Sequence, residues 1–245
     1  MTDSIIKTTD TFTNTSTDTF LAIPSGNGDV RGELISSCLT SAAKNRICVG
    51  FQKFSKLTQN FNSLLCAALN RKVHTHFAMI HSDVFPDYGW LSKMHEIMAQ
   101  TGADILSAVI PLKDNKGLTS TGLCKEETVP LLVKRYTLKE IHALPETFTH
   151  EHLVVNTGLM LINLKAPFIS MVGRGLCFRV TDQIIIKDGS FKAYGAPEDW
   201  LWSLDARGLG AKIYATRAIK VKHIGASYFS NSEIFGVDSE GYNLS

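Results

Sequence analysis

The chain has 245 residues, of which 44% are hydrophobic and 20% are charged, and 25 Lys and Arg against 23 Asp and Glu give a net charge of +2. This balance lacks the basic surplus that draws proteins to nucleic acid or anionic lipid, so we expect neither partner. No apolar run approaches the roughly 18 residues of a membrane helix, and no apolar signal segment opens the chain. We therefore expect a cytoplasmic protein without an integral membrane segment.

The first 19 residues are rich in threonine and offer no apolar face to bury. Biased polar stretches of this kind do not bury enough apolar surface to fold, so we expect a mobile leader over residues 1–19. Because α/β folds extend to about 250 residues as one unit, residues 20–245 are predicted to form a single domain.

Strand-like and helix-like patterns alternate through the first 110 residues. Short apolar runs predict strands, and apolar residues at helical spacing predict the helices between them. In chain order the pattern gives a strand at 20–26, a helix at 34–43, a strand at 46–51, a helix at 57–68, a strand at 75–83, a helix at 87–100 and a strand at 103–110. Such alternation predicts an α/β fold built on a parallel sheet.

Beyond residue 111 the pattern loosens. Residues 129–134 predict an antiparallel strand or hairpin arm, and residues 154–166 form a strand-like run that contains a glycine. A helix is predicted from Pro197 to Gly208, because proline suits the first helical turn, acidic residues favour the N-terminus and glycine suits the end. Two strands follow, and the second ends at His223.

Polar residues follow several predicted strands. In open α/β sheets, ligands bind beyond the carboxyl ends of the strands, so these residues are candidates for a site. They fall in three places: the loop 24–29, the segment 81–83, and a C-terminal group of Glu198, Asp199 and His223.

Several common motifs are missing. The first loop does not match G-x-G-x-x-G, and no acid follows the second strand to bind a ribose, which disfavours a dinucleotide site. No P-loop and no G-x-S-x-G sequence occurs. The pairs His74/His76 and His150/His152 share strand faces, but no cysteine or acid accompanies them at the spacing of a zinc site.

Seven segments together resemble the GT-A type nucleotide-sugar glycosyltransferases, especially the family-2-like branch, over about residues 20–228. In order they are AIPSGNGDVR, NFNSLLCAALN, THFAMIHSDVFP, ADILSAVIP, NTGLMLI, PEDWLWSLDARGLGAKIY and VKHIG. The resemblance implies an α/β fold in which helices flank a mostly parallel sheet, with a Rossmann-like nucleotide-binding half and an acceptor half. It also implies transfer of a sugar from a nucleotide-sugar donor, UDP- or GDP-linked, to a hydroxyl-bearing acceptor.

On the donor side, the resemblance implies that Asp83 and His223 bind Mn²⁺ or Mg²⁺. A divalent ion with hard oxygen ligands neutralises the negative charge of a diphosphate leaving group. The chain departs from the family at His81, where an Asp-x-Asp motif usually has its first acid; an imidazole can still contact a ribose hydroxyl. The remaining residues expected to contact the donor are Pro24, Ser25, Gly26, Asp29, Ser82 and Lys113.

On the acceptor side, the resemblance implies an inverting transfer with Asp199 as general base and Glu198 helping to hold the acceptor. A helix N-terminus favours the ionised form of Asp199, while neighbouring indoles would desolvate it. Asn156, Trp200 and Trp202 are expected to contact the acceptor, with the indole rings stacking on a sugar face.

Each of these residues also has a structural interpretation. Asp83 could end a strand, Glu198 and Asp199 could start a helix, the two tryptophans could fill a core, and His223 could be a structural histidine. Two alternative functions stay open: a catalytically silent nucleotide or carbohydrate binder, and a sugar-nucleotide pyrophosphorylase, although the first loop lacks the cations of the latter.

Overall fold

The computed structural model describes residues 18–26, 28–41, 46–52, 56–126, 131–225, 228–236 and 243–244. The predicted leader lies outside these residues except for its last two, because the first strand already begins at Asp18. None of the described helices combines the length and hydropathy needed to cross a membrane.

The helices are α1 (Gly32–Ser41), α2 (Leu57–Arg71), α3 (Trp90–Thr101), α4 (Leu138–Ala143) and α5 (Glu198–Gly208), with a 3-10 helix η2 (Pro167–Met171). The strands are β1 (Asp18–Pro24), β2 (Arg46–Gln52), β3 (His76–Ile80), β4 (Val84–Pro86), β5 (Ile105–Ala108), β6 (Leu118–Glu126), β7 (Leu132–Thr137), β8 (Thr147–Phe148), β9 (Leu153–Val154), β10 (Leu159–Asn163), β11 (Thr181–Lys187), β12 (Ser190–Ala196), β13 (Ile213–Thr216), β14 (Val221–Ile224), β15 (Tyr228–Ser230) and β16 (Asn243–Leu244). Every helix and strand predicted from the sequence corresponds to one of these elements.

The main sheet has seven strands in the order β2-β1-β3-β10-β5-β13-β8. Strand β1 is parallel to β2 and β3, and β13 is parallel to β5, whereas β10 is antiparallel to both neighbours and β8 to β13. The fold is thus mixed α/β, and the expectation of a mostly parallel sheet is not confirmed. The difference arises because β10, which directly follows Gly158, inserts in the opposite direction between β3 and β5.

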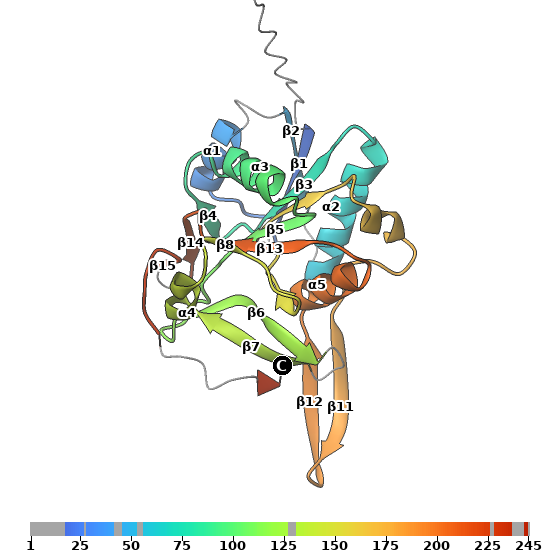
Figure 1. Ribbon diagram of the computed structural model, residues 1–245. Helices are drawn as coiled ribbons and strands as arrows, with labels where there is room; N and C mark the ends of the chain where they lie inside the picture. The colour runs from blue at the N-terminus through green and yellow to red at the C-terminus, as the bar shows by residue number, and fades with distance from the viewer. Residues whose placement is uncertain are drawn as a thin grey trace, which may run out of the picture.

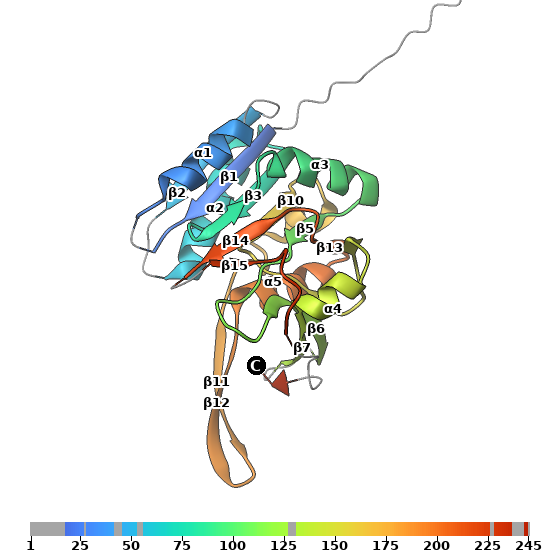
Figure 2. The same cartoon turned by 90° about the vertical axis from the view of Figure 1, so that its left-hand side faces the viewer.

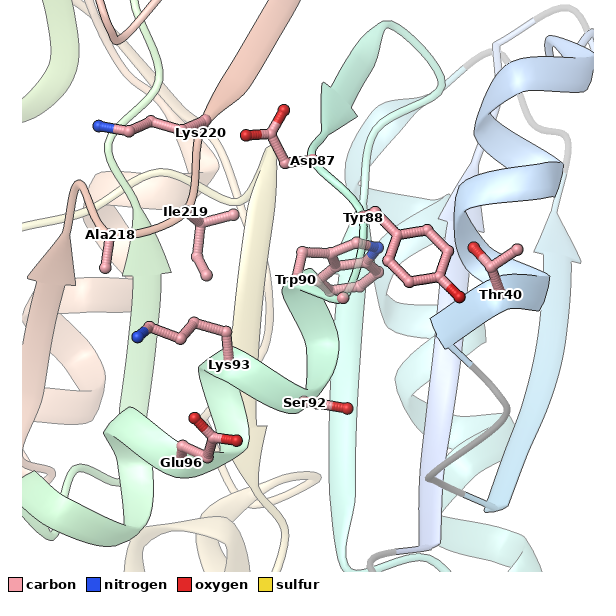
Figure 3. A pocket seen from close by; sticks show the side chains of 11 residues that line it. Thr40, Asp87, Tyr88, Trp90, Ser92, Lys93, Glu96, Ala218, Ile219 and Lys220 are labelled. Carbon is pink, nitrogen blue, oxygen red and sulfur yellow. The ribbon is translucent and has the colours of Figure 1, made fainter.

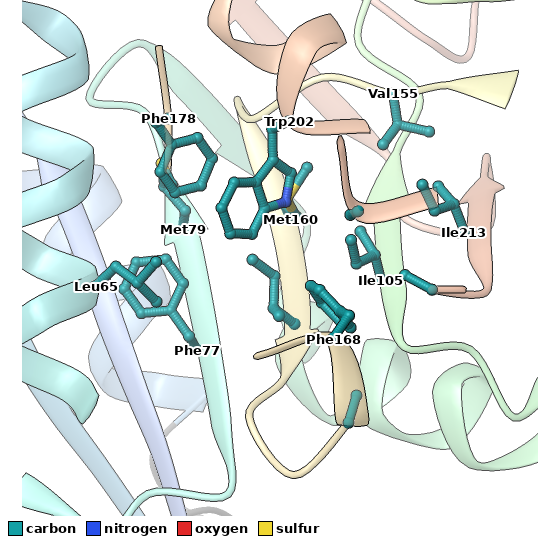
Figure 4. Packing of buried hydrophobic residues seen from close by; sticks show 14 of the residues in the cluster. Leu65, Phe77, Met79, Ile105, Val155, Met160, Phe168, Phe178, Trp202 and Ile213 are labelled. Atoms are coloured by element: carbon teal, nitrogen blue, oxygen red, sulfur yellow. The ribbon is translucent and has the colours of Figure 1, made fainter. Parts of the chain in front are cut away.

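Helices cover both faces of this sheet, with α1 and α3 on one face and α2 and α5 toward the other (Figures 1 and 2). Side chains of β1 alternate between two cores: Phe20 and Ala22 pack on the side of α2, while Leu21 and Ile23 pack on the side of α1 and α3. This period of two is what a strand buried on both faces produces. Figure 4 shows the first core, in which Trp202 of α5 stacks on Phe178 with ring centroids 4.1 Å apart.

Two smaller sheets complete the part of the fold that carries the site. Strands β16-β7-β6-β9 form one, and β15-β14-β4 form the other. The last two predicted strands, β13 and β14, therefore lie in different sheets. A hairpin of β11 and β12 extends away from the rest of the molecule in both views (Figures 1 and 2).

Candidate functional site

Three of the predicted segments leave the main sheet at the same edge. Neighbours β1 and β3 are parallel, so the loop 24–29 and the turn 81–83 both follow the carboxyl ends of their strands. Strand β10 is antiparallel to β3 and β5, which places the end of β5 and the chain leading to Lys113 at this edge as well. The edge of the sheet is thus the place where ligands bind in open α/β folds.

Asp83 and His223 meet because β4 pairs with β14. His223 stands opposite Val84 in this antiparallel pair, and the Ile224 backbone N–H donates to the Asp83 carbonyl at 2.8 Å. The His223 Nε2 atom consequently lies 3.6 Å from Asp83 Oδ2. The structure therefore brings together two of the predicted donor-site residues that are remote in sequence.

Lys113 completes this group. Its Nζ lies 2.5 Å from Asp83 Oδ2, and both side chains remain about one-third to two-fifths exposed, at 35% and 41%. Burial acts to raise the pKa of Asp83, but hydrogen bonds from His223 and Lys113 outweigh it and hold that pKa well below its usual range. Asp83 is therefore ionised throughout the physiological pH range.

The His223 ring is oriented by the backbone. Its Nδ1 donates to the carbonyl of Pro111 at 2.8 Å, and a carbonyl oxygen can only accept. The carboxylate that Nε2 faces also only accepts, so the protonated ring, with an N–H on each nitrogen, satisfies both partners.

His81 is turned toward the interior of the fold. Its Nε2 atom hydrogen-bonds with Thr157 Oγ1 at 3.3 Å, and its ring packs 5.2 Å from that of Phe61. Burial lowers its pKa to about 4, so the ring is neutral near pH 7. Ser82 lies in the same turn and is half-buried. The ribose contact of His81 and the donor contact of Ser82 stay predictions.

The first loop is held by Ser25. Its buried hydroxyl donates to the Asp29 carbonyl and accepts from the Gly28 N–H, each at 2.9 Å. Pro24 is buried at the end of β1, while Gly26 and Asp29 are exposed. Ser25 therefore shapes the loop, in which Gly26, Gly28 and Asp29 are exposed.

The side chains present do not fit a resident divalent ion. The separation of Asp83 Oδ2 and His223 Nε2 would suit two ligands of one ion, but the same carboxylate oxygen already bonds the Lys113 ammonium. Over the described ranges no three His, Cys, Asp or Glu side chains gather as a metal site would require. Mg²⁺ requires an octahedral shell of oxygen ligands. The neighbouring ammonium would also repel a metal ion through its like charge.

Asp199 and Glu198 occupy the first turn of α5, as predicted. Burial raises the pKa of Asp199 to about 7, with Glu198 adding to the shift, and the Trp200 N–H and Arg135 opposing it. Burial also raises the pKa of Glu198. The Asp199 carbonyl accepts from Ser203 Oγ at 2.8 Å, and that hydroxyl also bonds the backbone of Val155. A carboxyl with a pKa near 7 is matched to general base catalysis at neutral pH.

Arg135 of β7 is a charged neighbour of Asp199 that sequence reasoning missed. Its guanidinium lies 4.2 Å from the centre of the Trp200 ring, and its charge acts on Asp199 and Asp114. Nothing in the sequence singles it out, because a lone arginine in a strand belongs to no motif. Its position follows from the packing of the β6–β7 sheet against α5.

The three residues predicted to contact the acceptor, Asn156, Trp200 and Trp202, are buried in the fold. Their burial does not support the sugar contacts expected of them. Trp202 is wholly buried in the first core, while Trp200 is 2% exposed and its Nε1 donates to the Ser120 carbonyl at 3.3 Å. Asn156 is 3% exposed, and its amide donates to the Ala108 carbonyl at 2.8 Å. The polar atoms of Trp200 and Asn156 thus bond the backbone, while Trp202 fills the first core.

The Asp199 group is tied to the same edge through the backbone. Ser120, whose carbonyl accepts from the Trp200 indole, donates its own N–H to the Ile110 carbonyl at 3.0 Å, and Ile110 precedes the Pro111 carbonyl that orients His223.

A separate cavity of about 490 Å³ lies beside the start of α3, where Tyr88, Trp90 and Lys220 line it (Figure 3). None of the predicted site residues lines that cavity.

No family model and no curated protein matches the chain. Among solved structures, A197 from STIV is 19% identical, with a TM-score of 0.52 over 85% of this chain and 86% of that one. S. aureus TarS 1-349 matches with a TM-score of 0.43 at 12% identity, and its complex with UDP-GlcNAc with 0.44 at 11%. Both matches include 82% of this chain, and they span 58% and 56% of the two TarS chains. The likeness to A197 shows a shared fold; the TarS scores are too low to carry an argument.

Proposed function

We propose that this protein transfers a sugar from a nucleotide-sugar donor to a hydroxyl group of an acceptor. The observation that supports this most is the convergence of Asp83, Lys113 and His223 at the carboxyl end of β3. A diphosphate needs positive charge beside it, and this edge supplies an ammonium and an imidazole next to an open loop. The family resemblance found in the sequence implies the same class of donor.

The donor would lie across the edge of the sheet, with its nucleoside against the loop 24–29 and its diphosphate toward Lys113 and His223. As the bond between the anomeric carbon and the diphosphate oxygen breaks, the electron pair passes to that oxygen. Lys113 and His223 stabilise the negative charge that develops on that oxygen. Electrostatic stabilisation of this kind is usually the largest single contribution to catalysis.

The acceptor hydroxyl would be activated by Asp199. Its carboxylate takes the hydroxyl proton while the oxygen bonds to the anomeric carbon from the side opposite the leaving group, so the product has inverted configuration. General base catalysis of this kind contributes about 10²- to 10⁴-fold in rate. Glu198 and Arg135 set the protonation of Asp199 rather than meeting the reacting atoms.

The test is the release of nucleoside diphosphate from UDP- and GDP-sugars by the wild-type protein and by Asp199→Asn. The asparagine variant should keep nucleotide affinity and lose at least about 100-fold in turnover, because only the proton acceptor is removed. Turnover equal to that of the wild type would remove Asp199 from the mechanism.

A catalytically silent binder is the second candidate, and the position of His81 favours it. His81, which replaces the usual first acid, is bonded to Thr157 inside the fold, so the turn after β3 carries one acid, Asp83, in place of the family's usual two. The same assay separates the two functions: a silent binder would bind a nucleoside diphosphate but release none from any sugar nucleotide.

A further inference from the structure

The Lys113 ammonium is bonded to Asp83, one of the two residues predicted to bind a metal ion. The Nζ atom of Lys113 lies 2.5 Å from Asp83 Oδ2, and His223 Nε2 lies 3.6 Å from the same oxygen. One carboxylate therefore faces two basic groups. Sites for divalent cations show the reverse balance, in which several anionic oxygens surround the ion.

The neighbouring backbone positions the side chain of Lys113. A Cβ atom added at Gly225, just after β14, would meet Lys113 Cδ at 3.0 Å and its Cβ and Cγ at 3.5 Å. The lysine stem thus lies along the backbone of Gly225, where a larger residue would displace it. The chain that carries Lys113 is fixed in turn by the Leu112 N–H, which donates to the Leu118 carbonyl at 2.7 Å.

The ammonium can still reach a ligand. The Lys113 side chain is 35% exposed, and its flexible four-carbon stem allows the Nζ atom to exchange a carboxylate oxygen for a phosphate oxygen without a backbone change. A lysine binds phosphate as a compact point charge, which is the role that a metal ion otherwise has at a diphosphate.

We propose that Lys113 takes the place of the divalent cation, so that this protein binds its nucleoside diphosphate donor without metal. The inference rests on the proposed function, because it concerns how the same donor site holds its ligand. Asp83 is then a positioning residue that holds the ammonium at the edge of the sheet, and His223 is the second donor to the diphosphate.

The test is calorimetric titration of the whole protein with UDP and with GDP, once in EDTA and once in Mn²⁺. The wild type should bind one of them with equal affinity, within about threefold, in both buffers. Lys113→Met should weaken binding in EDTA by about 10- to 100-fold, since one charge-assisted hydrogen bond is lost. Lys222→Met, an exposed lysine on β14 beside His223, is the matched control and should bind as the wild type does.

Asp83→Asn separates the two ways of holding a diphosphate. With Lys113 as the cation, the amide variant changes the affinity by the same factor in EDTA and in Mn²⁺, because Asp83 acts only through the ammonium that it positions. With a metal ion as the cation, the same variant loses its Mn²⁺-dependent affinity. Binding by the wild type that requires Mn²⁺ would overturn the inference and leave the proposed function standing, whereas no binding of either nucleotide in either buffer would overturn both.

Discussion

Asp199 is the residue whose protonation sets the pH dependence of the proposed reaction. Its pKa is raised to about 7 by burial and by Glu198, and a general base acts only in its ionised form. We therefore expect kcat/KM to fall tenfold per pH unit below an apparent pKa near 7 and to level off above it. A pH profile of donor turnover measures this; an acid limb near pH 4, the ordinary range of an aspartate, would contradict it.

Two neighbours of Asp199 should move this limb in opposite directions. Glu198→Gln removes a negative charge that raises the pKa of Asp199, so the limb should shift to lower pH. Arg135→Gln removes a positive charge that lowers it, so the limb should shift to higher pH. Each shift should be about half a unit to one unit, as for charges in a partly solvated site. Parallel shifts in both variants would show a structural effect instead.

At the scale of single residues, the sequence predicted where chain segments meet better than which side chains remain accessible. Asp83 follows β3 and Lys113 follows β5 at the same edge, while His223 lies in β14, which pairs with β4 beside Asp83. The family resemblance implied that Asp83 and His223 meet. Trp202 and Asn156 carry the chemistry of a sugar site but are buried, and burial depends on contacts made by distant elements. No local pattern reports such contacts.

At the scale of elements, the pairing of β4 with β14 positions the donor site. Gly225 directly follows β14 and leaves room for the Lys113 stem. We expect Gly225→Val to displace Lys113 and to weaken binding of the nucleoside diphosphate by about tenfold, the value of one charged contact.

Gly208 in the last turn of α5 provides the control. An added Cβ atom there meets nothing within 4 Å, and its φ is not positive. Gly208→Ala should leave nucleotide affinity unchanged and raise the free energy of unfolding by about 0.4–1 kcal/mol. Calorimetric titration and urea denaturation measure the two effects, and equal affinity of Gly225→Val and the wild type would show that Lys113 does not bind the ligand.

The β11–β12 hairpin is one of several elements that the sequence patterns did not predict. Its strands alternate, so that Ile184, Ile186 and Phe191 share one exposed face, and Asp188 and Gly189 form its two-residue turn with φ of 53° and 73°. Asp-Gly between alternating runs is a strong hairpin signal, and it was available in the sequence. The antiparallel direction of β10 had no such signal, because a buried run looks alike in either direction.

At the scale of the whole molecule, buried histidines predict sensitivity to acid. Burial lowers the pKa of His76 and His81 to about 4, and burial together with His76 lowers that of His95 to about 3. The unfolded chain therefore binds more protons between about pH 4 and 6.5, and the free energy of unfolding should fall as the pH is lowered through this window. Asp199, whose pKa is raised, acts in the opposite sense over the same range.

His95→Gln isolates one of these groups. The ring of His95 shares a hydrogen bond of 2.9 Å with Thr19, and glutamine keeps a polar group there. Between pH 7 and 4.5 the variant should lose roughly 1–2 kcal/mol less stability than the wild type, after allowance for solvent screening. Urea denaturation at the two pH values measures the difference, and identical losses would contradict the role of His95.

The proposed mechanism requires that the donor group at the end of β3 and the base at the start of α5 act on one substrate. A crystal structure with the nucleoside diphosphate sugar analogue that binds most tightly tests whether they do. We predict the diphosphate within hydrogen-bond distance of Lys113 Nζ and His223 Nε2, and the anomeric carbon on the side of Asp199. A nucleotide bound instead in the cavity beside Tyr88 and Trp90, or a sugar directed away from Asp199, would contradict the account.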